Sequence, residues 1–116
     1  MNIIFDHNQV EQLKGKYTVL ELDTFGLPDG TIRAAHCVIE NITLESLSRI
    51  QSLMELHDSL ISNYKDRNWL YCEEVLKLLI GGWGGELDTF YINLQNRVKG
   101  YIANEPPENW TYIIQK

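Results

Sequence analysis

The sequence predicts an α+β fold, with a small antiparallel β-sheet packed on a three-helix C-terminal half. Three observations support this class. Residues 17–40 are rich in β-branched and aromatic side chains on both sides of a turn-forming segment, which is typical of a hairpin. From about Thr43 onward the apolar residues recur at helical spacing. The C-terminal half carries an ordered series of Trp, Gly and Pro landmarks: YKDRNW (64–69), GGWGGELD (81–88), RVKGY (97–101) and EPPENW (105–110).

The N-terminal segment predicts a short strand over residues 1–5 and a helix over residues 7–14. Asp6 is a favourable N-cap residue, and Gln9 stands three positions later, as in a capping box. Phe5 and Val10 have the spacing of a hydrophobic staple, and Gly15 is expected to end the helix.

The hairpin is expected to turn at Leu27-Pro28-Asp29-Gly30. Proline presets φ for a turn, aspartate bonds its own backbone, and glycine accepts a positive φ. Pairing across this turn would place Glu21 near Cys37 and Leu22 near His36. The C-terminal segment WTYII is expected to add a last strand, beside either the N-terminal strand or the hairpin.

Three helices are expected in the second half of the chain. The first runs from about Thr43 to about Lys65, and the polar turn 66–68 separates it from a second helix that begins at Trp69. Glycines 81 and 82 end the second helix, and a third begins at about Glu86. Pro106 and Pro107 end the helical part. The side chains expected to face inward on the third helix are Leu87, Phe90, Tyr91, Leu94, Val98, Tyr101 and Ile102.

Length and composition limit the classes of protein to consider. At 116 residues the chain is expected to form a single domain, with a strand-helix-hairpin portion (1–41) and a helical portion with a proline-rich tail (42–116). The net charge is −6 and the basic residues are scattered, so no nucleic acid partner is expected. No apolar run approaches the length of a membrane span and no signal peptide is recognisable, so we expect a cytoplasmic protein that does not bind membranes.

The tail landmarks carry a resemblance to a known family. Tyr64, Arg67 and Trp69 fit the pattern Y-x-x-R-x-W, and Arg97 and Tyr101 fit R-x-x-x-Y. The matching residues of the tail are Pro106, Pro107, Trp110 and Lys116. In these positions the segment from Leu56 to Lys116 resembles the helical tail module that follows the catalytic domain in bacterial class III adenylate and guanylate cyclases. As a whole, the chain is similar to small uncharacterised proteins of marine phages and bacteria.

The resemblance implies a helical accessory module without cyclase activity, because residues 1–55 leave no room for the cyclase catalytic domain and its paired aspartates. The sequence also departs from the family: GGWGG at 81–85 is foreign to it, and Trp110 is followed by Thr111-Tyr112 where family tails commonly read W-D-G. The step from Asn68-Trp69 to Cys72 also resembles the helix-to-helix turn of a tetratricopeptide repeat, of which one copy would fit.

Candidate catalytic and metal-binding groups are weak. His36 and Cys37 are adjacent in a predicted strand and so point to opposite faces, which makes a poor metal site. Cys37 and Cys72 have neither zinc-site nor disulfide-framework spacing and are expected to be buried thiols. No nucleophile-and-base signature or phosphate loop is present. We therefore expect no enzyme activity, no cofactor and no metal.

The function expected from the sequence is that of a non-enzymatic protein-interaction or regulatory module. Its expected contact surfaces are the hairpin edge and the aromatic tail around Trp83, Tyr101 and Trp110. Trp83 is interpreted either as core or as an exposed anchor. The partner is an unknown protein or a second copy of the chain. The alternative is a small-ligand-binding domain with a pocket between sheet and helices, lined by His36, His57, Tyr64 and Trp69.

Overall fold

The computed structural model of the protein describes residues 2–39 and 47–116. These residues form four helices and four strands, so the α+β class is confirmed. They group into two compact units. The sheet unit comprises residues 1–48 and 111–116, and the helical unit comprises residues 49–110. The C-terminal strand thus belongs with the N-terminal half of the chain, and the single domain expected from length stays a prediction.

The N-terminal elements follow the sequence prediction closely. Strand β1 (Asn2–Ile4) leads into helix α1 (His7–Lys14), and the Asp6 side chain accepts hydrogen bonds from the backbone N–H groups of Asn8 and Gln9. Val10 is the buried residue of α1. Gly15 follows the helix, as expected. Its φ is −74°, so it does not adopt the left-handed conformation that glycine often takes at a helix C-terminus.

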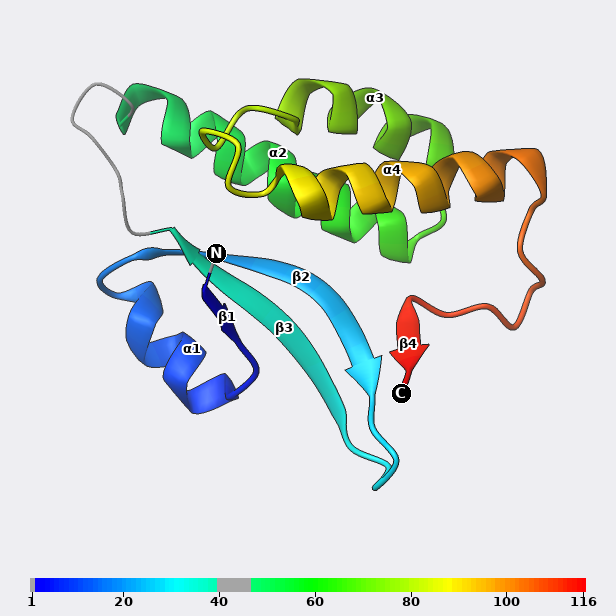
Figure 1. Ribbon diagram of the computed structural model, residues 1–116, viewed down its shortest axis with the longest axis horizontal. Helices are drawn as coiled ribbons and strands as arrows, with labels where there is room; N and C mark the ends of the chain where they lie inside the picture. Colours follow the sequence, from blue (N-terminus) through cyan, green and yellow to red (C-terminus); the bar gives the residue numbers. More distant parts are fainter. Residues whose placement is uncertain (1, 40–46) are drawn as a thin grey trace. The chain divides into compact units, whose positions relative to one another are not determined.

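The sheet of the described residues has the strand order β1-β3-β2-β4 (Figure 1). Strands β2 (Thr18–Gly26) and β3 (Ile32–Ile39) form the expected antiparallel hairpin, and β1 pairs antiparallel with β3. Strand β4 (Ile113–Gln115) pairs with β2, but in parallel orientation. The prediction of a wholly antiparallel sheet is therefore wrong for its C-terminal strand.

The hairpin turn is built as its sequence predicts. Gly30 has a φ of +89°, its N–H donates to the Leu27 carbonyl at 2.9 Å, and the Leu27 N–H donates to the Thr31 carbonyl at 2.8 Å. Asp29 accepts hydrogen bonds from the backbone N–H and the hydroxyl of Thr31. These bonds lower the pKa of the Asp29 carboxyl and fix the loop that joins the two strands.

The pairing register changes once along the hairpin. Next to the turn, Thr24 lies opposite Ala34, which is the register that the turn predicts. A β-bulge lies between Glu21 and Thr24, and beyond it Glu21 lies opposite His36, and Leu20 opposite Cys37. The predicted pairs Glu21–Cys37 and Leu22–His36 are therefore wrong by one residue, because the bulge places an extra residue in β2.

The helical unit contains α2 (Leu47–Lys65), α3 (Trp69–Leu79) and α4 (Asp88–Ala103). The predicted helix start at Thr43 lies outside the described residues. The buried side chains follow the expected helical stripes, although Ile102, expected to face inward, is exposed. None of the described helices combines the length and the apolar character that crossing a membrane requires. The buried residues of this unit include His57, Leu60, Ile61, Tyr64, Cys72, Val75, Leu76, Leu79, Phe90, Tyr91, Leu94 and Val98.

The glycine-rich segment between α3 and α4 reverses the chain direction. Gly81, Gly84 and Gly85 all have positive φ, a conformation that glycine adopts without steric cost. The Gly81 N–H donates to the Asp88 carboxylate at 2.7 Å, which ties the start of the turn to the start of α4. Trp83 is buried, with 8% of its surface exposed, so the core interpretation of this residue holds.

Candidate functional site

Four aromatic rings from four separate segments form one cluster in the helical unit. Tyr64 lies in the last turn of α2, Trp69 begins α3, Tyr101 lies near the end of α4, and Trp110 lies in the tail. The ring centroids of Trp69 and Tyr101 are 4.7 Å apart, and Trp69 and Trp110 meet edge to face at 5.2 Å. Tyr64 contacts both tryptophans, and Tyr101 contacts Trp110. Such pairs add about 0.5–1.5 kcal/mol each beyond the area that they bury, so the cluster fixes the tail to the helices.

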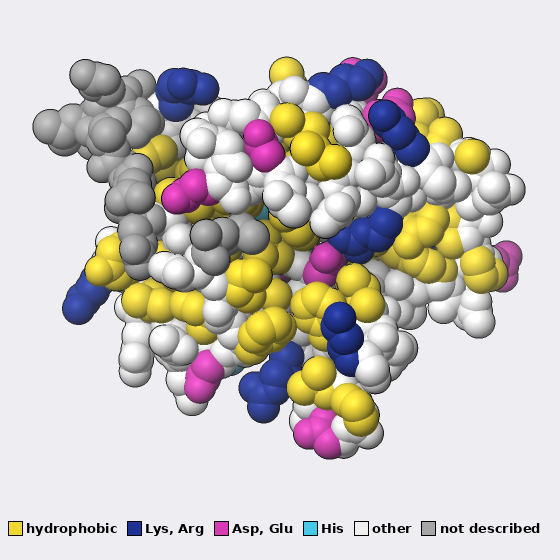
Figure 2. All heavy atoms as spheres, viewed as in Figure 1, with side chains coloured by type: hydrophobic (Ala, Val, Ile, Leu, Met, Phe, Trp, Pro, Cys, Tyr) yellow, Lys and Arg dark blue, Asp and Glu magenta, His cyan; other side chains and the backbone are white. Residues whose placement is uncertain are grey.

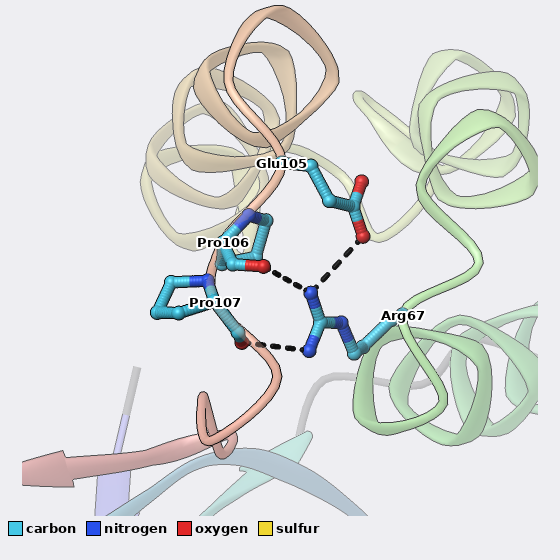
Figure 3. A network of polar contacts seen from close by, with 4 residues as sticks. All are labelled: Arg67, Glu105, Pro106 and Pro107. Carbon is cyan, nitrogen blue, oxygen red and sulfur yellow. Dashed lines mark hydrogen bonds and ion pairs between the residues drawn. The ribbon is translucent and has the colours of Figure 1, made fainter.

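Arg67 fastens the tail to the turn between α2 and α3 (Figure 3). Its guanidinium donates to the carbonyl oxygens of Pro106 and Pro107, the latter at 2.9 Å, and to the Glu105 carboxylate at 3.0 Å. The same guanidinium lies 5.8 Å from the ring centroid of Trp110. Arg67 has a φ of +66°, so a residue with a side chain holds a backbone conformation that glycine favours. We call the contacts of Arg67 with residues 105–107 the arginine latch.

A second arginine supports the cluster from α4. The Arg97 guanidinium donates to the Tyr64 hydroxyl at 3.3 Å and lies 5.7 Å from the centroid of the same ring. Both arginines of the predicted motifs thus act inside the helical unit by orienting aromatic rings and the tail. Their positions give a structural reason for the spacing of these landmarks in the sequence.

A groove lies beside the arginine latch. It has a volume of about 680 Å³ and receives apolar side chains from two helices. Leu70 and Tyr71 of α3 are 69% and 42% exposed, and Ile102 of α4 is 40% exposed. Figure 2 shows hydrophobic side chains at the surface over α3, with charged groups between them. We call this feature the α3–α4 groove; its lining residues are Asn63, Arg67, Asn68, Trp69, Leu70, Tyr71, Ile102 and Glu105.

Polar groups hold the rim of the α3–α4 groove in place. The Tyr71 hydroxyl lies 2.6 Å from Ser59 Oγ, and the Asn68 side-chain amide donates to the Asn63 side-chain oxygen at 2.8 Å. The indole Nε1 of Trp69 is buried and has no hydrogen-bond acceptor among the described residues. An indole N–H without an acceptor is costly in a protein interior. The groove therefore combines exposed apolar groups with a fixed polar rim, while the indole Nε1 of Trp69 is buried.

Trp83 and His57 belong to a separate buried chain of hydrogen bonds. The Trp83 indole donates to the Tyr91 hydroxyl oxygen at 3.0 Å, and that oxygen lies 2.8 Å from His57 Nδ1. All three side chains are buried. Tyr91 thus joins α2, the glycine-rich turn and α4 through polar contacts in the core, and neither His57 nor Trp83 lies at the surface.

His36 lies on β3 in the sheet unit. Its Nδ1 lies 3.3 Å from the Ala34 carbonyl oxygen, and Glu21 faces it across the hairpin. Burial lowers the pKa of His36, against smaller upward effects from the Ala34 carbonyl and the Glu21 charge. No group of three or more His, Cys, Asp or Glu side chains in residues 2–39 and 47–116 is arranged to hold a metal ion.

The predicted site residues therefore separate into three places. Tyr64, Trp69, Tyr101 and Trp110 meet in the aromatic cluster, His57 and Trp83 join the buried polar chain, and His36 lies in the sheet unit. The predicted pocket between sheet and helices stays a prediction.

Sequence reasoning missed Leu70, Tyr71 and Ile102 as surface groups. A signal was present for the first two, because Leu70, Tyr71 and Leu78 put apolar side chains on the face of α3 opposite its buried stripe.

Comparison of the chain with protein-family models, with curated proteins and with solved structures finds no match. The resemblance to cyclase tail modules thus stays a prediction. The residues on which it rests do have a defined place in this chain, since Tyr64, Arg67, Trp69 and Tyr101 meet the tail residues in the cluster and the latch.

Proposed function

We propose that the chain is a non-enzymatic protein-interaction module and that its helical unit binds a partner protein at the α3–α4 groove. One observation carries this proposal: Leu70, Tyr71 and Ile102 expose apolar surface beside an arginine and a tryptophan. Arginine and aromatic residues are enriched among the side chains that contribute most to protein binding, and they act best when a polar rim surrounds them. Asn63, Asn68 and Glu105 supply such a rim.

The groove is also held rigid before any partner arrives. The aromatic cluster lies directly behind it, and the arginine latch fixes the tail at one side. A preorganised surface loses little conformational entropy on binding, so more of the contact energy appears as affinity. This rigidity favours a defined partner over nonspecific adhesion.

The test is a capture experiment with the full chain, followed by affinity measurement with any protein that it retains. Burying a leucine side chain contributes about 1.5–3 kcal/mol, so Leu70→Ser is expected to weaken binding by about tenfold or more. Leu78→Ser is the matched control, because Leu78 is an equally exposed leucine of α3 that does not line the groove. Equal weakening by both variants, or retention of no protein at all, would contradict the proposal.

A small-molecule ligand is the second candidate, because the volume of the groove falls within the range of ligand sites. Native mass spectrometry of the protein purified from its host separates the two candidates. A co-purifying small molecule that is lost in Leu70→Ser and kept in Leu78→Ser would assign the groove to a ligand instead of a protein.

A further inference from the structure

One edge of the sheet is only half covered. Strand β3 extends from Ile32 to Ile39, whereas β1 pairs only with His36, Cys37 and Val38 (Figure 1). The chain then leaves the sheet at Asp6 and enters α1. Among the described residues, no strand lies beside the outer edge of β3 from Ile32 to Ala35. We call this segment the open β3 edge.

The turn geometry shows which backbone groups face outward along the open β3 edge. The Leu27 N–H donates a hydrogen bond to the Thr31 carbonyl, so the N–H and C=O groups of Thr31 point toward β2. Backbone direction alternates along an antiparallel strand, so the N–H and C=O groups of Ile32 and Ala34 point away from β2. The contact of His36 Nδ1 with the Ala34 carbonyl oxygen, at 3.3 Å, agrees with this direction. Because His36 already contacts the Ala34 carbonyl, the groups that an added strand can bond are the N–H and C=O of Ile32 and the N–H of Ala34.

A hollow lies along the same edge and has a volume of about 640 Å³. Two large apolar side chains in its lining are exposed, Phe5 at 47% and Ile32 at 61%. The hollow therefore offers apolar contacts beside the outward backbone groups. Its lining includes Phe5, His7, Ile32, Arg33, Ala34 and His36.

The charged side chain in the lining of this hollow is opposite in sign to the whole chain. The chain carries a net charge of −6 with histidines counted as neutral, whereas, among the described residues, the hollow is lined by Arg33 and by no aspartate or glutamate. The nearby Asp29 carboxylate attracts Arg33 but is already held by hydrogen bonds from Thr31. Complementary charge selects a partner and speeds its encounter. The hollow thus favours a ligand that carries carboxylates.

We infer that the open β3 edge binds an acidic, extended segment of a partner polypeptide, which adds a strand in line with β1. The segment bonds to the outward N–H and C=O groups of Ile32 and to the outward N–H of Ala34. Successive residues of β3 point to opposite faces, so a strand beside them meets Ile32 on one face and Arg33 on the other. A sequence that alternates apolar and acidic residues satisfies both faces. This surface belongs to the sheet unit and is independent of the α3–α4 groove.

The direct test is fluorescence anisotropy with a short labelled peptide in which glutamate alternates with valine and isoleucine. The full chain is expected to bind this peptide, and to bind the same peptide with lysine in place of glutamate at least tenfold more weakly. Arg33→Glu reverses the charge of an exposed side chain and is expected to weaken binding of the glutamate peptide at least tenfold. Ala34→Pro removes an outward N–H without breaking a bond to β2 and is expected to have a similar effect.

Amide hydrogen exchange locates the bound peptide. The amides of Ile32 and Ala34 are expected to exchange more slowly with the glutamate peptide present, while the amide of Arg33, which points toward β2, serves as the internal reference. Leu70→Ser is expected to leave peptide binding unchanged, which separates this site from the α3–α4 groove. Absence of binding, or equal binding of the lysine peptide, would overturn the inference. So would unchanged affinity in both Arg33→Glu and Ala34→Pro, or loss of peptide binding in Leu70→Ser.

Discussion

The guanidinium of Arg67 donates a hydrogen bond of 2.9 Å to the carbonyl oxygen of Pro107, so the turn after α2 holds the tail that follows α4. Because hydrogen bonds from a charged group contribute about 1.5–3 kcal/mol, we expect Arg67→Ala to lower the free energy of unfolding by about 2–3 kcal/mol. Arg67→Gly removes the same bonds but relieves the left-handed backbone, which costs a non-glycine residue roughly 1–2 kcal/mol. Chemical denaturation of both variants is the measurement, and Arg67→Gly is expected to be the more stable. The reverse order would show that the turn stores no strain.

The buried oxygen of Tyr91 provides a second prediction. Tyr91→Phe keeps the ring but removes the atom that contacts both Trp83 Nε1 and His57 Nδ1. Losing a partner of buried polar groups costs about 1–3 kcal/mol for each group, so we expect a loss of stability of about 2–4 kcal/mol. Tyr101→Phe, at a half-buried ring of the aromatic cluster, is the control and is expected to change stability by less than about 1 kcal/mol. Equal effects in thermal unfolding would argue against the buried polar chain.

Two glycines are expected to respond to alanine in opposite directions. Gly15 has a φ of −74°, and a Cβ atom there would meet its nearest neighbour at 3.8 Å, so Gly15→Ala is expected to raise stability by about 0.4–1 kcal/mol. Gly81 has a φ of +84° with nothing near the added atom, so Gly81→Ala is expected to lower stability by roughly 1–2 kcal/mol through backbone strain alone. Urea denaturation compares the two variants, and a stabilised Gly81→Ala protein would rule out this account of the turn.

Burial raises the pKa of the Cys72 thiol to about 11, from 9.0. The unfolded chain therefore loses this proton at a lower pH than the folded one, and stability is expected to fall as pH rises from about 9 to about 11. The fall should be smaller in Cys72→Ala, measured by denaturation at each pH. At pH 8 the native protein is also expected to resist thiol reagents, since Cys37 and Cys72 are both buried, and to react fully once unfolded.

The lowered pKa of His36 predicts the opposite trend at acidic pH. Because burial disfavours the charged imidazole in the folded state, the unfolded chain binds more protons as pH falls below the ordinary histidine value of 6.5. Stability is therefore expected to decrease as pH drops through 6.5 toward the folded pKa, and then to level off with respect to this group. His36→Asn should flatten that part of the profile, measured by chemical denaturation at each pH.

The helices and strands of this fold follow from local sequence signals. The pairing register of the hairpin and the aromatic cluster do not. The Asp6 cap, the turn at Gly30 and the helix starts at Trp69 and near Glu86 depend on short-range chemistry that the sequence shows directly. The bulge near Glu21 depends on how two strands pair with each other, so turn geometry alone put Glu21 opposite the wrong residue.

The candidate site was predictable only in part. Tyr64, Trp69, Tyr101 and Trp110 stand out by type and spacing, and they do meet. Their roles were not predictable, because whether an aromatic ring is buried depends on contacts between distant segments. Trp83 illustrates this limit, since flanking glycines suit both a projecting ring and the observed buried ring, whose indole N–H donates to the Tyr91 hydroxyl.

The parallel pairing of β4 with β2 affects the order in which the protein assembles during synthesis. Residues 49–110 separate the hairpin from its C-terminal neighbour, so the edge of β2 from Thr24 to Gly26 has no neighbour to pair with until the ribosome has translated the whole helical unit. Contacts of such long sequence separation form slowly. A nascent chain is thus expected to expose an incomplete sheet to chaperones until Ile113 and Ile114 leave the exit tunnel, and a pause in translation within α4 would prolong that interval.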